Sequence, residues 1–420
     1  MSAYAQILLY AIPFFMILLI IETLYGWAVK NQTLRSFDTI SSLSSGITNI
    51  LKDILGLTLV IVSYAWMEEK ISLFQMEDSI WVYVISFVAI DFAGYVKHYM
   101  SHHVNYFWNE HVIHHSSEEF NLPCALRQSI SGFFSISAFL LIPAALLGMP
   151  PKVIATILPI HLFMQFWYHT RHIPKLGFLE YLIITPSQHR VHHAINTIYL
   201  DKNIGQIFPF WDRMFGTFQE ELDEEPCVYG TKKNATTWNP VIINFQHLWM
   251  LMQDAWHADR WIDKFTIWIK PTGWRPADVA ERFPVEVVEE ASDQVKYDTI
   301  ASKWLHAWSW TQMVMTNAFL MYMLVNFDQL TFQEMCLYAL FLVTHIYAYT
   351  TLMDLNRSAV FFEAIKCFGG IYLILTTGDW FGLDGYWALG SVAVCAYLVV
   401  SLLVVAVFSQ GELKGKSVVS

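Results

Sequence analysis

The chain of 420 residues carries a net charge of −11, and it is 55% hydrophobic, 16% aromatic and only 15% charged. Soluble domains usually contain about 25% charged residues, so this composition excludes an ordinary soluble protein and predicts a polytopic membrane protein. The acidic balance also argues against nucleic acid as a partner, because binding phosphates requires clustered Lys and Arg.

Apolar runs suited to transmembrane helices, which need about 20 residues, recur along the chain. The first run lacks a preceding basic segment and a small-residue cleavage site, so we expect a retained transmembrane helix rather than a signal peptide. The best candidates are 7–28, 80–97, 132–149, 308–326, 333–353 and 385–408. Weaker segments, expected to be short spans, re-entrant or buried, are 54–67, 152–168 and 360–377.

Two polar stretches, 219–240 and 271–303, interrupt the apolar pattern. We therefore expect three segments within one structural unit. They are a membrane core at 1–218, a polar and interfacial segment at 219–303, and C-terminal transmembrane helices at 304–420.

Between the polar stretches, apolar side chains recur every three or four residues and predict one apolar face of a helix within 242–269. These side chains are Phe245, Leu248, Trp249, Met252 and Trp256. Because tryptophan favours the headgroup layer, a helix lying in the membrane surface is one interpretation. A helix packed on the protein's own core is the other, and the sequence leaves both open.

Histidine is concentrated in one part of the chain: twelve of the sixteen histidines lie between His98 and His193. Eight of them form one HxxxH and two HxxHH boxes: His98, His102, His111, His114, His115, His189, His192 and His193. Steps of three and four place side chains on one face of a helix. Each box therefore presents two or three imidazoles in one direction, and three such boxes indicate a metal site.

The predicted topology allows the boxes to converge. The first two follow the run 80–97, and the third follows 132–149 and 152–168, which meet at Pro150 and Pro151. Two crossings, or one re-entrant hairpin, return the chain to the same membrane face. A catalytic zinc uses three protein ligands and a structural zinc four, so eight imidazoles predict two metal ions with open positions.

The ligand type alone does not identify the metal, because imidazole binds Fe, Zn, Cu and Ni. The sequence lacks HExxH, which argues against a zinc protease. A histidine-rich metal transporter is an alternative of a different class, and its ligands are expected along pore-lining helices rather than at one end.

The order of the three boxes at membrane edges resembles the fatty acid hydroxylase/sterol desaturase superfamily of di-iron membrane oxygenases. Three longer stretches resemble the members that act on alkylglycerols: DFAGYVKHYMSH, HVIHHSSEEFNLPCALRQS and TPSQHRVHHAINTIYLDKNIGQIFPFWDRMFGTF. The layout is similar too, with a polar stretch and then a C-terminal apolar block that carries DLNRSAVFFEAIK. We accordingly expect an all-α, polytopic membrane protein with a histidine-lined di-metal cap on one membrane face.

The resemblance implies O2-dependent di-iron hydroxylation of a lipid alkyl chain, at the ether-linked carbon of an alkylglycerol, giving fatty aldehyde and glycerol. It implies two Fe2+ ions, O2 and an external electron donor, with tetrahydrobiopterin as the donor of the alkylglycerol-type members. Hydroxylation or desaturation of another lipid, such as a fatty acyl chain, a sterol or a carotenoid, is the alternative. The expected location is the endoplasmic reticulum membrane in a eukaryote, or the inner or plasma membrane in a bacterium.

Several further residues are candidates for the site. His169 resembles a position that is often histidine in the family, so we count it as a ninth candidate ligand. Asp91 lies two helical turns before His98 on the same face, and we expect its carboxylate to orient a ligand ring. Asp91 and Asn196 are our candidate catalytic residues. Asn203 is a further candidate to support the ligands.

One position departs from the family pattern. The residue after the second histidine of the first box is typically Glu in the alkylglycerol-type members, and here it is His103. It is an added ligand, a supporting donor or neither. Glu118 or Glu119 is expected to supply the missing carboxylate.

Overall fold

The computed structural model describes residues 3–57, 59–60, 62–135 and 137–412. Over these ranges helices dominate, and the named strands are one parallel pair of two residues each, β1 (Leu59–Val60) and β2 (Phe134–Ser135). Five of the described helices are long and apolar enough to cross a membrane. The predicted all-α, polytopic membrane class is therefore confirmed.

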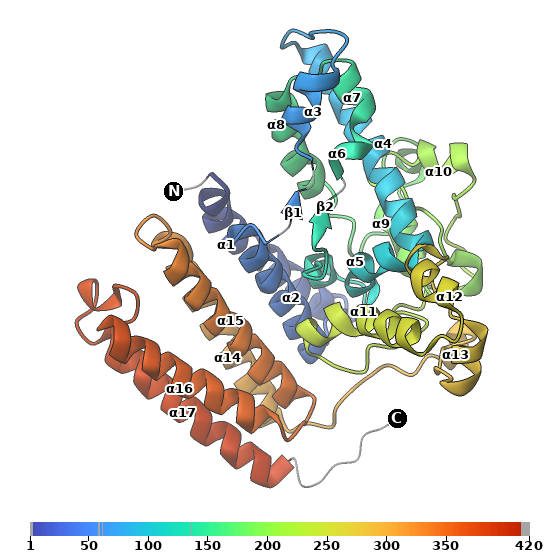
Figure 1. Cartoon of the computed structure of the whole chain (residues 1–420). Coiled ribbons are helices and arrows are strands. Elements are labelled where there is room, and N and C mark those ends of the chain that lie inside the picture. Colours follow the sequence, from blue (N-terminus) through green and yellow to red (C-terminus); the bar gives the residue numbers. More distant parts are fainter. Residues whose placement is uncertain (1–2, 58, 61, 136, 413–420) are drawn as a thin grey trace.

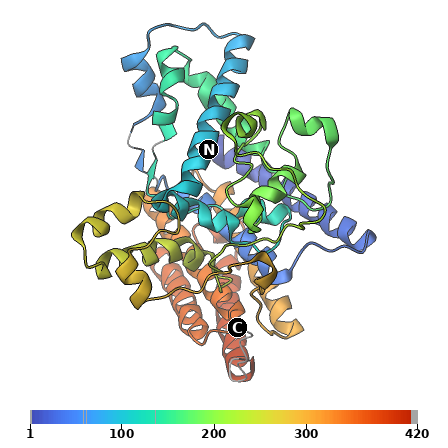
Figure 2. The ribbon, with the colours of Figure 1, turned by 90° about the vertical axis from the view of Figure 1, so that its right-hand side faces the viewer.

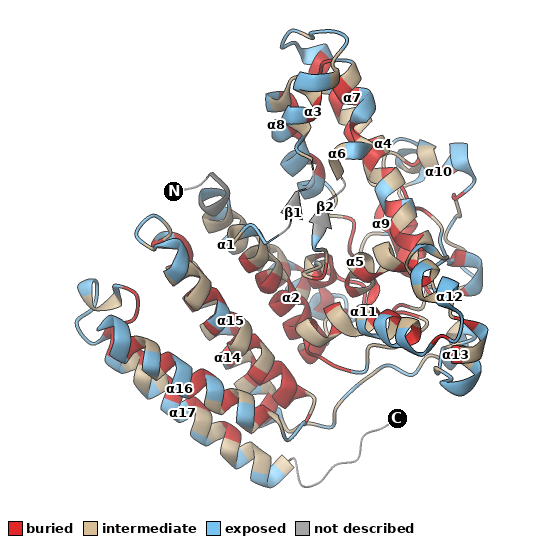
Figure 3. Cartoon of the chain, in the orientation of Figure 1, coloured by how far each residue is buried: buried red, intermediate tan, exposed pale blue. Residues whose placement is uncertain are grey.

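The five apolar helices are distributed between the two ends of the chain. They are α1 (Ala3–Ala28), α4 (Ile80–His103), α15 (Phe332–Met353), α16 (Ala359–Thr377) and α17 (Gly390–Gly411). In Figure 1 the C-terminal helices lie side by side as a bundle that packs against α1 and the helix that follows it. Figure 3 shows half-buried and exposed residues along the outward faces of α16 and α17, as expected for helices that face lipid.

The main core lies between the C-terminal bundle and α2 (Ser36–Ile54). Ile40 of α2 and Leu320 of α14 (Lys303–Val325) are fully buried there. The predicted span 308–326 corresponds to α14, which has the length of a span but is not among the described helices that are apolar enough to cross a membrane, since polar residues such as Gln312 and Asn317 interrupt it.

A second core surrounds the upper half of α4, at the opposite end from the C-terminal bundle in Figure 2. It is built with α3 (Tyr64–Ile71), α6 (Ser137–Leu140), α7 (Ile142–Leu146) and α8 (Pro151–Phe163). Of these, α6, α7 and α8 return the chain from the second histidine box to the third, and because they are short, the hairpin alternative describes the connection better than two full crossings.

The predicted span at 132–149 is wrong. The run is divided among β2, α6 and α7, and its end is fixed by Gly148, which has a φ of +69°. A Cβ at this glycine would lie 1.8 Å from the carbonyl oxygen of Phe74, so the chain must turn there without a side chain. The weaker segment 360–377, in contrast, forms the long apolar helix α16.

The middle of the chain wraps around the histidine region. Its helices are α5 (Asn105–His115), α9 (Pro186–His193), α10 (Phe210–Phe215), α11 (Pro240–His257), α12 (Trp261–Thr266) and α13 (Ala277–Arg282). The 3-10 turns of the chain are η1 (Leu122–Leu126), η2 (Gly177–Tyr181), η3 (Thr197–Tyr199), η4 (Ile267–Ile269), η5 (Ala291–Asp293) and η6 (Leu383–Gly385).

Helix α11 combines both interpretations of its sequence. It packs on α5 and α2 through a mixed face that includes the buried Ile243, His247 and Leu251. Trp249 and Trp256 of the predicted apolar face are 59% and 80% exposed. The helix therefore packs on the protein with one side and leaves an apolar side open, as a helix in a membrane surface would.

Candidate metal centre

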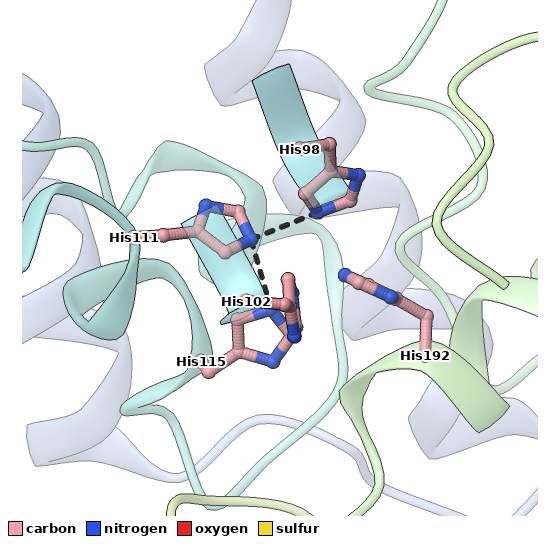
Figure 4. A group of neighbouring side chains, drawn as sticks. All are labelled: His98, His102, His111, His115 and His192. Atoms are coloured by element: carbon pink, nitrogen blue, oxygen red, sulfur yellow. Dashed lines mark hydrogen bonds between the residues drawn. The ribbon is translucent and has the colours of Figure 1, made fainter. Parts of the chain in front are cut away.

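The histidine boxes converge into two adjoining groups. The first group draws on α4, α5 and α9 and contains His98, His102, His111, His115 and His192 (Figure 4). The second draws on α5, α9 and the turn after α8, and contains His114, His169, His189 and His193. Within each group, one ring nitrogen from every histidine lies within 4.8 Å of the others. All eight boxed histidines and His169 are thus brought together.

Each HxxHH box is divided between the two groups. His111 and His115, four residues apart, share a helix face and enter the first group, whereas His114 enters the second. In α9 the division is reversed: His189 and His193 enter the second group, and His192 enters the first. Two short helices therefore supply ligands to both groups at once.

The spacing of the inward nitrogens fits a bound cation. The Nε2 atom of His111 lies 2.9 Å from that of His98 and 3.0 Å from that of His115. In the second group, Nε2 of His193 lies 3.1 Å from both His114 and His189. With metal–nitrogen bonds of about 2.0–2.1 Å, neighbouring ligand nitrogens fall roughly 3 Å apart. A ring nitrogen carries at most one proton, and one proton on Nε2 of His111 cannot form hydrogen bonds to both His98 and His115. A metal ion shared by the rings accounts better for these short distances.

Outward hydrogen bonds fix the tautomer of several rings. The Nδ1 of His98 donates to the carbonyl of Ile204 at 2.6 Å, and that of His192 donates to the carbonyl of Lys202 at 3.0 Å. A carbonyl only accepts, so Nδ1 carries the proton and Nε2 of the neutral ring keeps an inward lone pair. The Nε2 atoms of His102 and His192 are buried without a hydrogen-bond partner in the described chain, as metal ligands would be.

The electrostatic environment keeps the rings outside α4 neutral. Burial, followed by the like charge of His98 and other neighbours, lowers the pKa of His114 to about 3. Burial also lowers the pKa of His189 and His192 well below the usual histidine value. Metal ions bind neutral imidazole, so these rings are in the ligand form at neutral pH.

Asp91 does not orient a ligand ring, and this expectation is wrong. Its fully buried carboxylate accepts hydrogen bonds from Nε2 of His161 at 2.7 Å and from the backbone of Ile207 at 3.0 Å. Two helical turns separate Asp91 from His98 by about 10 Å along the helix, beyond the reach of the carboxylate. Asp91 instead fixes the loop whose Ile204 carbonyl accepts from His98.

Asn196 and Asn203 support the third box through the backbone. Asn196 donates to Glu225 at 2.6 Å and accepts from the backbone of Val228 at 2.9 Å. Asn203, with a φ of +52°, donates to the carbonyl of Gln188 within α9 at 2.9 Å. Neither side chain belongs to the histidine groups, so both position the segments around α9.

Neither His103, which occupies the position of the family's glutamate, nor Glu118 and Glu119, which we expected to replace its carboxylate, belongs to the histidine groups. His103 stacks on Tyr99, with ring centroids 3.9 Å apart, and belongs to neither histidine group. Glu118 accepts from the backbone of Tyr297 at 2.7 Å, and Glu119 pairs with Lys296 at 2.5 Å. Both carboxylates are therefore engaged with the linker before α14.

Sequence reasoning missed Asp201. Its Oδ1 lies 3.1 Å from Nδ1 of His102, which makes it the carboxylate partner that we had expected Asp91 to be. The available signal was its place in the DKN turn after the third box, where only Asn203 was singled out. Phe120 was missed as well, and its ring lies 5.2 Å from that of His193 as part of the wall of the second group.

A cavity of about 580 Å3 leads away from both groups. That volume is within the range of about 300–1,000 Å3 that ligand pockets occupy. Five histidines of the two groups line it: His98, His111, His114, His169 and His189. Among the nine, His111 and His114 are the two that are only partly buried. The far wall of the cavity is apolar and comes from α1, α6, α8 and the turn after α8: Leu8, Phe15, Leu140, Leu162, Phe163 and Phe166.

Paired histidine groups beside the end of the apolar helix α4, next to a cavity with one apolar wall, are the features of a membrane metalloprotein. Residues 83–217, which contain all nine histidines, match the fatty acid hydroxylase family. Alkylglycerol monooxygenase of Homo sapiens is 32% identical over 359 residues, which cover 85% of this chain and 80% of the relative. The Xenopus tropicalis enzyme of that name is 32% identical over 89% of this chain and 83% of its own.

The chain belongs to the fatty acid hydroxylase family, in the branch of the alkylglycerol monooxygenases. A more distant relative is ornithine lipid hydroxylase OlsE of Rhizobium tropici, which is 28% identical over 37% of this chain and 45% of its own. No solved structure matches significantly. The predicted class, a membrane monooxygenase, is confirmed, and the transporter alternative is not supported.

Proposed function

We propose that the chain is a di-iron monooxygenase that hydroxylates an ether lipid at the ether-linked carbon of its alkyl chain. One oxygen atom of O2 enters that C–H bond, and the other leaves as water with two electrons and two protons from a reductant. The resulting hemiacetal collapses to a fatty aldehyde and a glycerol. The observation that carries the proposal is the convergence of nine imidazoles, in two groups, beside a cavity that has an apolar wall.

Iron suits the ligand set and the reaction. Imidazole binds Fe, Zn and Cu, but zinc has no redox chemistry and cannot activate O2. The nine histidines would hold two iron ions, one in each group, and bound iron would supply O2 activation and oxygen insertion. The name of the relatives, alkylglycerol monooxygenase, supports an ether lipid as the substrate.

In this proposal the chain's own residues orient the histidine rings, position the alkyl chain and exclude water from the reacting carbon. The outward partners of His98, His102 and His192 fix the ring orientations before any metal binds. The phenylalanines of α1 and α8 would hold the alkyl chain in a dry channel that ends at His111 and His114. Catalysis here depends on holding one carbon at a fixed distance from the reactive centre.

The reductant comes from outside the chain in this proposal. The sequence has no GxGxxG or Walker A motif for a nucleotide cofactor. We propose tetrahydrobiopterin as the donor, with a ferredoxin- or cytochrome-type protein as the alternative. The membrane would be the endoplasmic reticulum in a eukaryote, or the inner or plasma membrane in a bacterium.

The test uses the whole protein in nanodiscs with iron, O2, tetrahydrobiopterin and 1-O-hexadecylglycerol. We expect O2-dependent formation of hexadecanal, with one atom of 18O2 in the hydroxylated product before collapse. Product formed from a fatty acyl ester or a sterol, with none from the glyceryl ether, would instead favour the other lipid-hydroxylase function.

His103 offers a separate prediction about the reductant. Because it stacks on Tyr99 outside both groups, His103→Ala should retain both metals. We expect the ratio of reductant consumed to product formed to change, by about twofold or more, because the family's glutamate position borders the first box. The ratio is measured with tetrahydrobiopterin and with a ferredoxin-type donor, and metal content is measured alongside. Loss of a metal ion in His103→Ala would make this residue a ligand and contradict its placement.

A further inference from the structure

The cavity has a polar side that the proposed chemistry does not use. Glu110 of α5, the residue before His111, lines it, and Oε1 of this carboxylate is buried with no hydrogen-bond partner in the described chain. Lys97 of α4, the residue before His98, lines the same cavity and is exposed, so the polar side is near solvent. Further polar residues line the cavity as well, and they include Gln206 and two more cations, Lys52 and Arg127.

The cavity is therefore amphipathic. Its apolar wall is formed mainly by α1 and α8. Its polar side lies next to the histidines, because Lys97 directly precedes His98 in α4 and Glu110 directly precedes His111 in α5. A lipid placed with its alkyl chain along the apolar wall would have its headgroup beside Glu110. Glu110 as a whole is half-buried, but a buried carboxylate oxygen without a donor is costly, and a bound ligand with donors would remove that cost.

We propose that Glu110 accepts hydrogen bonds from the free hydroxyl groups of the substrate's headgroup and so sets which carbon faces the metals. This inference rests on the proposed function and names its substrate class: a neutral glyceryl ether with two free hydroxyls. An ionised carboxylate has two acceptor oxygens, which match the two donors of a vicinal diol. It would repel a phosphate in the same place. Of the cations that line the cavity, Arg127 is paired with Asp38 at 2.7 Å and Lys52 donates to the carbonyl of Ser129 at 2.9 Å, which leaves Lys97 as the cation nearest to solvent.

A glycine maintains the position of this carboxylate. A Cβ at Gly132 would lie 3.1 Å from Cδ of Glu110 and 3.3 Å from both of its oxygens. Such contacts are tight, so Gly132→Ala should shift the carboxylate by a few tenths of an ångström.

The experiment compares three lipids with one alkyl chain: 1-O-hexadecylglycerol, hexadecyl methyl ether and 1-O-hexadecylglycerol 3-phosphate. For each lipid, kcat/KM is measured for the wild-type protein, Glu110→Gln, Glu110→Leu and Gly132→Ala. Glu69→Gln removes the same charge at an exposed site and is the matched control. Equilibrium binding of the three lipids without reductant gives a second readout that does not depend on turnover.

We expect the wild-type protein to prefer the glyceryl ether over the methyl ether. Loss of a hydrogen bond to a charged group should reduce this preference on the order of tenfold or more in Glu110→Leu, with smaller losses in Glu110→Gln and Gly132→Ala. The fraction of product hydroxylated at carbons other than the ether-linked one should rise in the same order.

The inference is overturned if Glu110→Leu retains the wild-type preference in both turnover and binding, or if the wild-type protein prefers the phosphate. These outcomes differ from failure of the proposed function. In that case the wild-type protein would produce no aldehyde from any of the ethers, and the binding series alone would decide the role of Glu110.

Discussion

Replacing His192 or His114 with alanine should reduce turnover by more than about 100-fold while leaving the membrane helices folded. His192 belongs to the first histidine group and His114 to the second, so each variant should lose one metal ion and retain the other. Changes in residues that only support metal ligands already cost 10–100-fold, so loss of a ligand should cost more. Transmembrane helices are held by internal hydrogen bonds and packing, and circular dichroism should match the wild type.

The matched control is His257→Ala, because His257 is exposed and belongs to neither histidine group. Its ring bonds to the carbonyl of Gln253 in its own helix and packs on Phe283, and its backbone carbonyl, which accepts from Arg282, is kept in the variant. Its turnover and metal content should match those of the wild type. Wild-type activity in His114→Ala or His192→Ala would remove that residue from the ligand set.

The second large effect concerns a buried ion pair in the C-terminal bundle. Lys366 and Glu363 of α16 are 0% and 1% exposed and lie 2.5 Å apart, and Lys366 also donates to Ser401 at 2.9 Å. Lys366→Met leaves Glu363 buried without its cation, which should lower the free energy of unfolding on the order of 3 kcal/mol. Thermal unfolding in detergent measures the loss.

Two variants make this prediction specific. The double variant Glu363→Leu with Lys366→Met removes both charges and should recover most of the lost stability, because no unpaired charge remains. Lys152→Met, at a side chain that is 81% exposed, makes the same charge change without burial. Equal unfolding temperatures for Lys366→Met and Lys152→Met would show that the ion pair does not stabilise the bundle.

Local spacing made the histidine site predictable. His98 and His102, four residues apart in one helix, must share a face, and so must His189 and His193. The division of each HxxHH box between two groups could not be predicted, because it depends on how α5 and α9 face each other. His169 follows no box, and only the family resemblance identified it.

The errors also have physical causes. The run 132–149 is apolar enough for a span, but Gly132, Pro143 and Gly148 divide it into short pieces that bury against α3 and α4. Helix α2 was not predicted as a span. Its buried apolar residues, such as Ile40 and Leu43, are interrupted by buried polar ones such as Ser41 and Ser44, so the sequence has no continuous apolar run there. Asp91 was assigned from helical phase alone, which ignores the distance along the helix.

The most direct test of the account is the iron content of the whole protein, purified without O2 from cells supplied with iron. The account predicts two iron ions per chain, one for each histidine group, falling to one in His114→Ala and in His192→Ala. A wild-type protein that holds a single tightly bound metal ion per chain, with iron and zinc counted together, would contradict it.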